Sequence, residues 1–262
     1  MATHGSEPIY SSAVAVGRSV FGLLRLQRKV TGIEHVPNEG GAILAITHFG
    51  YLDFALTEWV IWCHNRRKVR FMAKESVFAK PVLGFLLRGM RHIPVNMKAG
   101  AAAFDSAVTA LKAGELLGVF PEAGVNASFT VRDLKTGAVR LAAQAGVPII
   151  PVAVWGGHRV LTKNHKPTLR DAYKTLVSVT FGPPITIGPT ADPVELTHAL
   201  HAELQTMVDT LQSEYPVDGT GQWWQPRHLS GTAPTPEEAA AADAERKLRR
   251  EAEAAERARK TP

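Results

Sequence analysis

The stretch G-A-I-L-A-I-T-H-F-G-Y-L-D, which runs from Gly41 to Asp53, decides the class of fold. It begins with an almost uninterrupted apolar run, as expected of a strand that is buried on both faces. The run ends at His48, Gly50 gives the chain the freedom to turn, and a helix is predicted over residues 53–64. A buried strand that passes through a short loop into a helix is typical of an α/β domain.

The same alternation continues along most of the chain. Further strands are predicted at residues 69–73, 93–95, 116–120, 147–155 and 174–181. Further helices are predicted at residues 9–30, 75–88 (partly broken), 100–113, 136–145 and 193–214. This order predicts an α/β fold with a mostly parallel central sheet flanked by helices. It divides the chain into an N-terminal segment (1–30), a central domain (31–230) and a charged C-terminal segment (231–262).

The N-terminal segment is predicted to be an amphipathic helix. Its most hydrophobic stretch, residues 11–30, is interrupted by the bases Arg18, Arg25, Arg28 and Lys29, so we do not expect it to span a membrane. The basic residues suit a helix that lies on acidic lipid head groups. A helix packed on the domain, with its basic face in water, fits the pattern equally well.

The C-terminal segment changes abruptly to Ala, Glu and Arg. T-P-E-E, from Thr235 to Glu238, has the form of a capping box with proline at the first helical position. No apolar stripe follows, so a helix here has little surface to bury. We expect either a solitary exposed helix or a frayed tail.

The composition limits the partners and the chemistry. A net charge of +6 favours anionic partners such as nucleic acid, acidic lipid or small anions. The chain has no zinc-finger spacing, RNA-binding aromatic signature or Walker loop, so we expect no nucleic acid. The single cysteine, Cys63, excludes an internal disulfide and follows an apolar run, which predicts a buried thiol. The first ten residues contain Glu7 and no basic run, so no secretory signal is expected.

His48 and Asp53 are the candidate catalytic pair. A neutral imidazole deprotonates hydroxyl groups near neutral pH, and a carboxylate that fixes its tautomer makes it more effective. Five residues on a regular helix turn through about 500°, so the two would not share a helix face. The pair requires His48 in the loop and Asp53 in the first helical turn. The alternative is a surface histidine, with Asp53 serving only as a helix cap.

Glu122 and several bases are the candidate substrate contacts. Glu122 follows a predicted strand in F-P-E-A-G, where its carboxylate would accept hydrogen bonds from substrate hydroxyls. It could equally be an acid near a helix dipole. The bases that could hold a phosphate are Lys74, Lys98, Arg132 and Lys135. The sequence has no H-E-x-x-H motif, G-x-S-x-G elbow or G-x-G-x-x-G fingerprint, so neither a metal nor a nucleotide cofactor is expected.

Four ordered blocks resemble the glycerol-phosphate and lysophosphatidate acyltransferase superfamily. H-F-G-Y-L-D is similar to its H-x4-D block, and A-K-E-S-V-F with G-M-R-H-I-P-V-N is similar to its second. F-P-E-A-G is similar to F-P-E-G-T, and V-P-I-I-P-V is similar to the last block. The resemblance covers residues 30–187, approximately.

The resemblance implies transfer of a fatty acyl group from a thioester, on coenzyme A or acyl carrier protein, to a hydroxyl of glycerol 3-phosphate, lysophosphatidate or a related lysophospholipid. His48 would be the base and Asp53 its orienting partner, while Glu122, Gly124 and their loop would hold the acceptor. No cofactor or metal is implied. Peripheral or monotopic attachment to the cytoplasmic face of an anionic membrane would follow.

Two departures from the family pattern concern the acceptor. The second block usually ends V-D-R, whereas this chain has Val95, Asn96 and Met97, and the third usually continues with an arginine, whereas this chain has Val125. Lys98, Arg132 or Lys135 would have to compensate, or the acceptor carries a larger head group. Two alternatives remain beside acyl transfer: a catalytically silent lipid-binding protein and an acyl thioesterase.

Overall fold

The computed structural model describes residues 7–96, 100–188 and 191–260. The strands are β1 (Gln27–Thr31), β2 (Ala42–Ile46), β3 (Val69–Lys74), β4 (Ile93–Val95), β5 (Leu116–Val119), β6 (Ile149–Trp155) and β7 (Leu176–Phe181). The longer helices are α1 (Pro8–Leu23), α2 (Asp53–Asn65), α4 (Pro81–Gly89), α5 (Gly100–Lys112), α6 (Gly137–Ala145), α9 (Pro193–Ser213) and α10 (Pro236–Lys260). Short helical turns are η1 (Ile33–His35), α3 (Glu75–Phe78), α7 (Gly157–Val160), α8 (Leu169–Ala172) and η2 (Arg227–Leu229).

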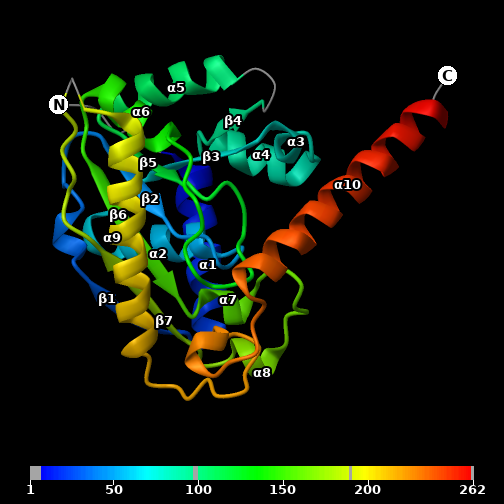
Figure 1. The fold of residues 1–262 in the computed structure, drawn as a ribbon. Coiled ribbons are helices and arrows are strands. Elements are labelled where there is room, and N and C mark those ends of the chain that lie inside the picture. The colour runs from blue at the N-terminus through cyan, green and yellow to red at the C-terminus, as the bar shows by residue number, and fades with distance from the viewer. Residues whose placement is uncertain (1–6, 97–99, 189–190, 261–262) are drawn as a thin grey trace.

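The strands described form one sheet in the order β1-β7-β6-β2-β5-β3-β4 (Figure 1). Neighbouring strands are parallel except β6 and β7, which are antiparallel. The predicted mostly parallel sheet flanked by helices is therefore confirmed. Because β2 and β5 are parallel neighbours, the loops after them lie at the same edge of the sheet. This edge is where ligands bind in open α/β sheets.

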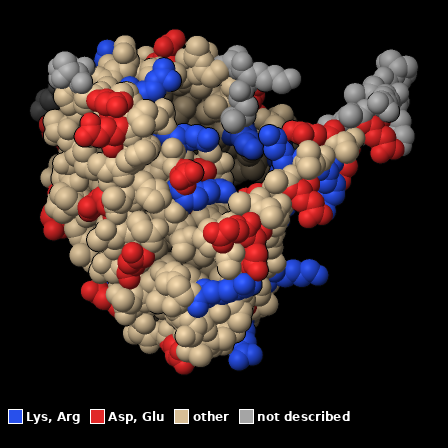
Figure 2. Space-filling model, in the orientation of Figure 1, with Lys and Arg blue, Asp and Glu red and all other residues tan. Residues whose placement is uncertain are grey.

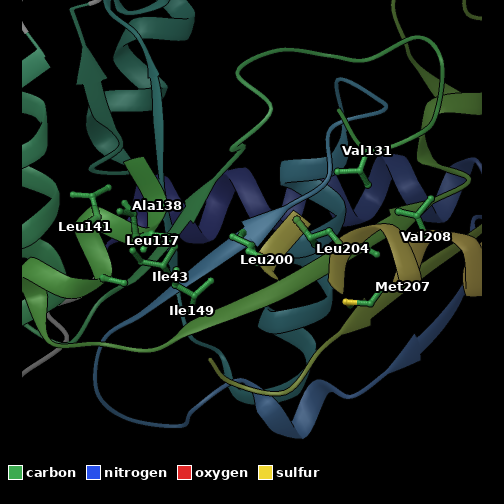
Figure 3. Close-up of a cluster of buried hydrophobic side chains, with 14 of the residues drawn as sticks. Ile43, Leu117, Val131, Ala138, Leu141, Ile149, Leu200, Leu204, Met207 and Val208 are labelled. Atoms are coloured by element: carbon green, nitrogen blue, oxygen red, sulfur yellow. The ribbon is translucent and has the colours of Figure 1, made fainter. Parts of the chain in front are cut away.

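Helices cover both faces of the sheet because the central strands are apolar on both sides. In β2, Ile43 and Ala45 belong to the core beneath α5, α6 and α9, while Ala42, Leu44 and Ile46 belong to the core beneath α1 and α2. This division follows from the two-residue period of a strand. Figure 3 shows Ile43 of β2 in the first core, together with Leu200 and Leu204 of α9.

The N-terminal helix is shorter than predicted. The helix expected over residues 9–30 ends at Leu23, and residues 27–31 form the edge strand β1, which pairs with β7. Arg25 adopts a left-handed φ of 51°, which turns the chain out of the helix. The sequence of β1, Q-R-K-V-T, is almost entirely exposed, so it lacks the apolar alternation that would have identified a strand.

The C-terminal segment is helical rather than frayed. Thr235 and Glu238 form the predicted capping box: the Thr235 N–H donates to Glu238 Oε2 at 3.0 Å, and the Glu238 N–H donates to Thr235 Oγ1 at 3.2 Å. From this start α10 projects away from the body of the protein (Figure 1). Leu248, halfway along it, is exposed.

Two further features concern the surface. Cys63 is exposed, so the predicted buried thiol is wrong: it lies in the last turn of α2, beyond the buried residues Leu56, Val60 and Ile61. Within residues 7–96, 100–188 and 191–260, no helix is both long and apolar enough to cross a bilayer.

Candidate active site

His48 and Asp53 lie together at the carboxyl edge of the sheet. His48 is in the loop after β2, and its Nδ1 is 3.2 Å from Oδ2 of Asp53, the first residue of α2. The N–H of Gly50 donates to the same oxygen at 2.8 Å. His48 in the loop and Asp53 in the first turn of α2 occupy the positions that the predicted pair requires. Gly50 is needed for close approach rather than for an unusual φ, since a Cβ there would lie 3.0 Å from the main chain of His158.

The surroundings orient the imidazole of His48. Its ring stacks on Phe120, with 4.0 Å between centroids and 23° between planes. An ionised Asp53 only accepts hydrogen bonds, so the proton belongs on Nδ1 and the lone pair on Nε2. Burial raises the pKa of Asp53, although the hydrogen bond and attraction of His48 act to lower it. The pair therefore has the arrangement of a general base and its orienting carboxylate.

Glu122 braces the loop of His48 from behind. Its Oε1 accepts the main-chain N–H of His48 at 2.9 Å, and its Oε2 accepts from Asn126 Nδ2 at 3.3 Å and the Arg132 N–H at 3.4 Å. The side chain is buried, and burial raises its pKa against these hydrogen bonds. The carboxylate therefore faces groups of the protein, and its contact with an acceptor hydroxyl stays a prediction.

A cavity of about 450 Å³ opens beside His48. Of the predicted substrate contacts, Lys74, Gly124 and Lys135 line it. Its other walls are largely apolar and include Met72, Phe104, Phe120 and Leu141. The cavity thus brings a base and two cations to an apolar chamber that is open to solvent. Lys98 lies outside the described residues.

Arg132 lies behind the cavity rather than on its wall. Its guanidinium donates to the carbonyl oxygen of Gly124, and its Nε is 3.9 Å from Oε2 of Glu122. Sequence reasoning missed its neighbour Lys163, whose Nζ lies 3.5 Å from the carbonyl oxygen of Val125. It also missed Asn126, whose N–H donates to the carbonyl oxygen of His48 at 2.8 Å. Neither residue belongs to a motif, so only their tertiary contacts could have identified them.

A second, larger cavity of about 620 Å³ lies among α1, α2 and α4. Nearly all of its wall is apolar; Val14, Phe54, Phe71 and Leu86 are among the lining residues. Phe71 stacks on Phe120 with 6.2 Å between centroids, and Phe120 in turn stacks on His48. Two aromatic rings therefore link the wall of this apolar cavity to the candidate base.

The His, Cys, Asp and Glu side chains are spread over the part of the chain that the structure describes. No three His, Cys, Asp or Glu side chains are grouped there in a way that could hold an ion. His158, which has no acidic neighbour in the sequence, is buried and contacts the main-chain oxygen of Trp224 through Nε2 at 3.0 Å. Burial lowers its pKa to about 3, as expected for a neutral core histidine.

The fold and the His48–Asp53 arrangement agree with a sequence match to a family of acyltransferases. The sequence model of the family described as Acyltransferase matches residues 27–155, from β1 to the end of β6. This region of the chain thus matches the Acyltransferase family, which confirms the resemblance of its four sequence blocks to the glycerol-phosphate and lysophosphatidate acyltransferase superfamily.

Individual relatives agree with this assignment. A 1-acyl-sn-glycerol-3-phosphate acyltransferase of Bacillus subtilis is 31% identical over 129 residues, which are 49% of this chain and 62% of that protein. One from Borreliella burgdorferi is 28% identical over 138 residues, which are 52% of this chain and 54% of that protein. The matched region thus spans less than two thirds of each relative.

A solved structure shares the fold. The crystal structure of the 1-acyl-sn-glycerophosphate acyltransferase from Thermotoga maritima superposes with a TM-score of 0.66 at 20% sequence identity. The superposition covers 79% of this chain and 81% of that one.

Proposed function

We propose that this chain transfers a fatty acyl group from a thioester to a hydroxyl of lysophosphatidate or a related glycerophosphate acceptor. The observation that carries the proposal is the 3.2 Å contact between His48 and Asp53 on the wall of an open cavity. The cavity offers Lys74 and Lys135 to an anionic group and apolar side chains to a hydrocarbon chain. The names of the relatives support this class of acceptor.

The reaction that we propose begins with proton transfer to the base. Nε2 of His48 takes the proton of the acceptor hydroxyl as its oxygen attacks the thioester carbonyl carbon. The tetrahedral intermediate then expels the thiolate, which receives the proton from the imidazolium. Asp53 stabilises the imidazolium while it carries the charge. Such general-base catalysis typically contributes about 10²–10⁴-fold.

The donor is a thioester of coenzyme A or of acyl carrier protein, so the acyl group is already activated. The developing oxyanion needs hydrogen-bond donors nearby. Lys74 and Lys135 are the cations on the cavity wall, so they are available for the oxyanion or for an acceptor phosphate. Met97 and Val125, which stand where the family pattern has charged residues, are assigned neither role.

We also propose that the protein works at a membrane surface, to which it binds peripherally. Exposed apolar side chains gather on α1 and α4, two helices that contact each other. The most exposed of them are Val16, Val20 and Leu23 on α1 and Val82 and Phe85 on α4. A patch of this kind beside basic residues suits a head-group interface. Attachment on this side would bring the apolar cavity close to the lipid.

An acceptor panel tests the proposed function. Purified protein is given a long-chain acyl group on coenzyme A or on acyl carrier protein and, separately, glycerol 3-phosphate, both lysophosphatidate isomers and several lysophospholipids. We expect an ester product with at least one phosphate-bearing acceptor. Release of free fatty acid without ester would identify a thioesterase. Lipid binding without turnover, with both donor types, would identify a silent binding protein and reject the proposal.

A further inference from the structure

A carboxylate of the C-terminal helix is held by two cations next to the catalytic loop. Asp243 of α10 accepts from Nη1 of Arg132 at 3.3 Å through Oδ2, and its Oδ1 contacts Nζ of Lys163. Nη1 of Arg246, one turn further on, is 3.8 Å from the same Oδ1. Partial burial would raise the pKa of Asp243, but Lys163 and Arg132 outweigh it and lower the pKa.

The two cations are fixed to the loop that forms the cavity wall. Arg132 donates to the carbonyl oxygen of Gly124, which lines the cavity with His48, and Lys163 lies 3.5 Å from the carbonyl oxygen of the next residue, Val125. Only 15% of the Lys163 side chain and 32% of the Arg132 side chain are exposed. Both cationic groups therefore point at the carboxylate of Asp243 rather than into solvent.

The Nε of Arg132 is buried and has no hydrogen-bond partner among the described residues. This Nε lies 3.9 Å from Oε2 of Glu122, so the donors that face Asp243 are Nη1 of Arg132, Nζ of Lys163 and Nη1 of Arg246. Figure 2 shows basic side chains bordering a hollow beside the base of the projecting helix. A small anion with several oxygens would satisfy these donors better than a single carboxylate does.

The ion pairs that Asp243 of α10 makes with Arg132 and Lys163 are weak enough to break reversibly. Asp243 and Arg132 are partly solvated, and ion pairs of this kind contribute little to stability. Beyond its first turn, where Ala239 is buried, the helix offers little apolar surface, and Leu248 is exposed. A doubly charged phosphate would compete effectively with the single charge of Asp243.

We propose that Arg132 and Lys163 form an anion subsite that binds the phosphate monoester of a substrate, and that Asp243 fills this subsite in the free protein. The inference rests on the proposed function for the identity of the ligand. Lysophosphatidate carries such a phosphate, and so does the ribose of coenzyme A. Both present the same chemistry to the two cations.

Steady-state kinetics with two variants test the subsite. Lys163→Met removes one cation, and we expect it to raise the KM for the substrate whose phosphate binds there by about tenfold, with kcat nearly unchanged. Asp243→Asn removes the competing charge, and we expect it to lower the same KM roughly two- to fivefold. Measuring the KM for lysophosphatidate and for acyl-coenzyme A separately tells which substrate supplies the phosphate.

Matched controls come from the exposed part of α10. Lys247 and Glu251 are 77% and 61% exposed and pair with each other at 4.0 Å, so Lys247→Met and Glu251→Gln change the same charges away from the subsite. We expect both to leave each KM unchanged. An increase of KM in Asp243→Asn would mean that Asp243 positions the cations instead of competing with substrate, and would overturn the inference.

Binding separates this inference from the proposed function. Calorimetric titration of the full chain with glycerol 3-phosphate and with inorganic phosphate needs no turnover. We expect weaker binding in Lys163→Met and tighter binding in Asp243→Asn, in variants whose circular dichroism matches the wild type. Equal affinities in all three proteins would reject the subsite even in an active enzyme. The expected shifts in a protein without transferase activity would reject only the proposed function.

Discussion

The carboxylate of Glu122 accepts a hydrogen bond from the main-chain N–H of His48, with 2.9 Å between Oε1 and N. Four residues further on, the N–H of Asn126 donates to the carbonyl oxygen of His48 at 2.8 Å. Both main-chain polar groups of the candidate base are therefore held by the loop after β5. The position of the imidazole depends on a segment more than 70 residues away in the sequence.

Glu122→Ala tests this brace. The substitution leaves the N–H of His48 and the donors of Asn126 and Arg132 without their acceptor inside the protein. We expect a loss of about 3 kcal/mol in the free energy of unfolding and a fall in kcat of tenfold or more. Glu122→Gln keeps one acceptor oxygen and should lose less of both. Urea unfolding and steady-state kinetics measure the two effects, and wild-type values for Glu122→Ala would contradict the bracing role.

Asp53→Asn tests the orientation of the base. The amide has nearly the shape of the carboxylate, but it cannot stabilise an imidazolium and does not enforce the tautomer. We expect kcat to fall by roughly 100-fold or more, while the KM values stay within a few fold. Asp209→Asn on the exposed side of α9 is the matched control. A variant at position 53 that kept its kcat would show that the aspartate only begins the helix.

The pH dependence of stability reports on Glu7. Arg70 donates to both of its oxygens, at 2.7 and 2.8 Å, and so ties the start of α1 to β3. Burial alone would raise the pKa of Glu7, but Arg70 and Lys68 together lower it to about 2, from 4.5. A lowered carboxylate pKa stabilises the fold above pH 4.5, and this contribution disappears as the pH falls to about 2.

We therefore expect Glu7→Gln to be less stable than wild type at pH 7, by about 1–2 kcal/mol once solvent screening of the ion pairs is included. The difference should shrink steadily as the pH falls from about 4.5 towards 2. Chemical denaturation across this range measures it, and other carboxylates cancel because both proteins share them. A difference that stayed constant from pH 7 to pH 2 would contradict the lowered pKa of Glu7.

Membrane binding tests the exposed face of α1 and α4. Val16 is 64% exposed and Phe85 is 59% exposed, and both line the apolar cavity. We expect the double variant Val16→Asp, Phe85→Asp to bind vesicles containing phosphatidylglycerol at least tenfold more weakly. Leu248→Asp on α10 is the control, since Leu248 is 66% exposed on a different part of the surface. Equal co-sedimentation of all three proteins would place the membrane contact elsewhere.

The sequence predicts those parts of the fold whose residues carry a local signal. β2 and β6 are apolar along their whole length, so their burial was evident without a structure. β1 is an exposed edge strand, and only its pairing with β7 defines it. His48 and Asp53 are close in the chain, which is why the pair could be recognised.

The remaining parts of the site depend on contacts between distant segments. The ends of the neighbouring strands β2 and β5 decide whether Glu122 faces the cavity or the loop of His48. The convergence of Arg132, Lys163 and Asp243 joins three segments, two of them outside the region that the family model matches. No local pattern encodes such a contact.

The proposed reaction depends on the removal of the acceptor hydroxyl proton by His48. The most direct measurement compares wild type and His48→Ala in transferring a long-chain acyl group from coenzyme A to lysophosphatidate, with unfolding curves recorded to establish that the fold is retained. We expect the folded variant to lose at least 100-fold in kcat. A folded His48→Ala protein that formed the ester at the wild-type rate would contradict the account.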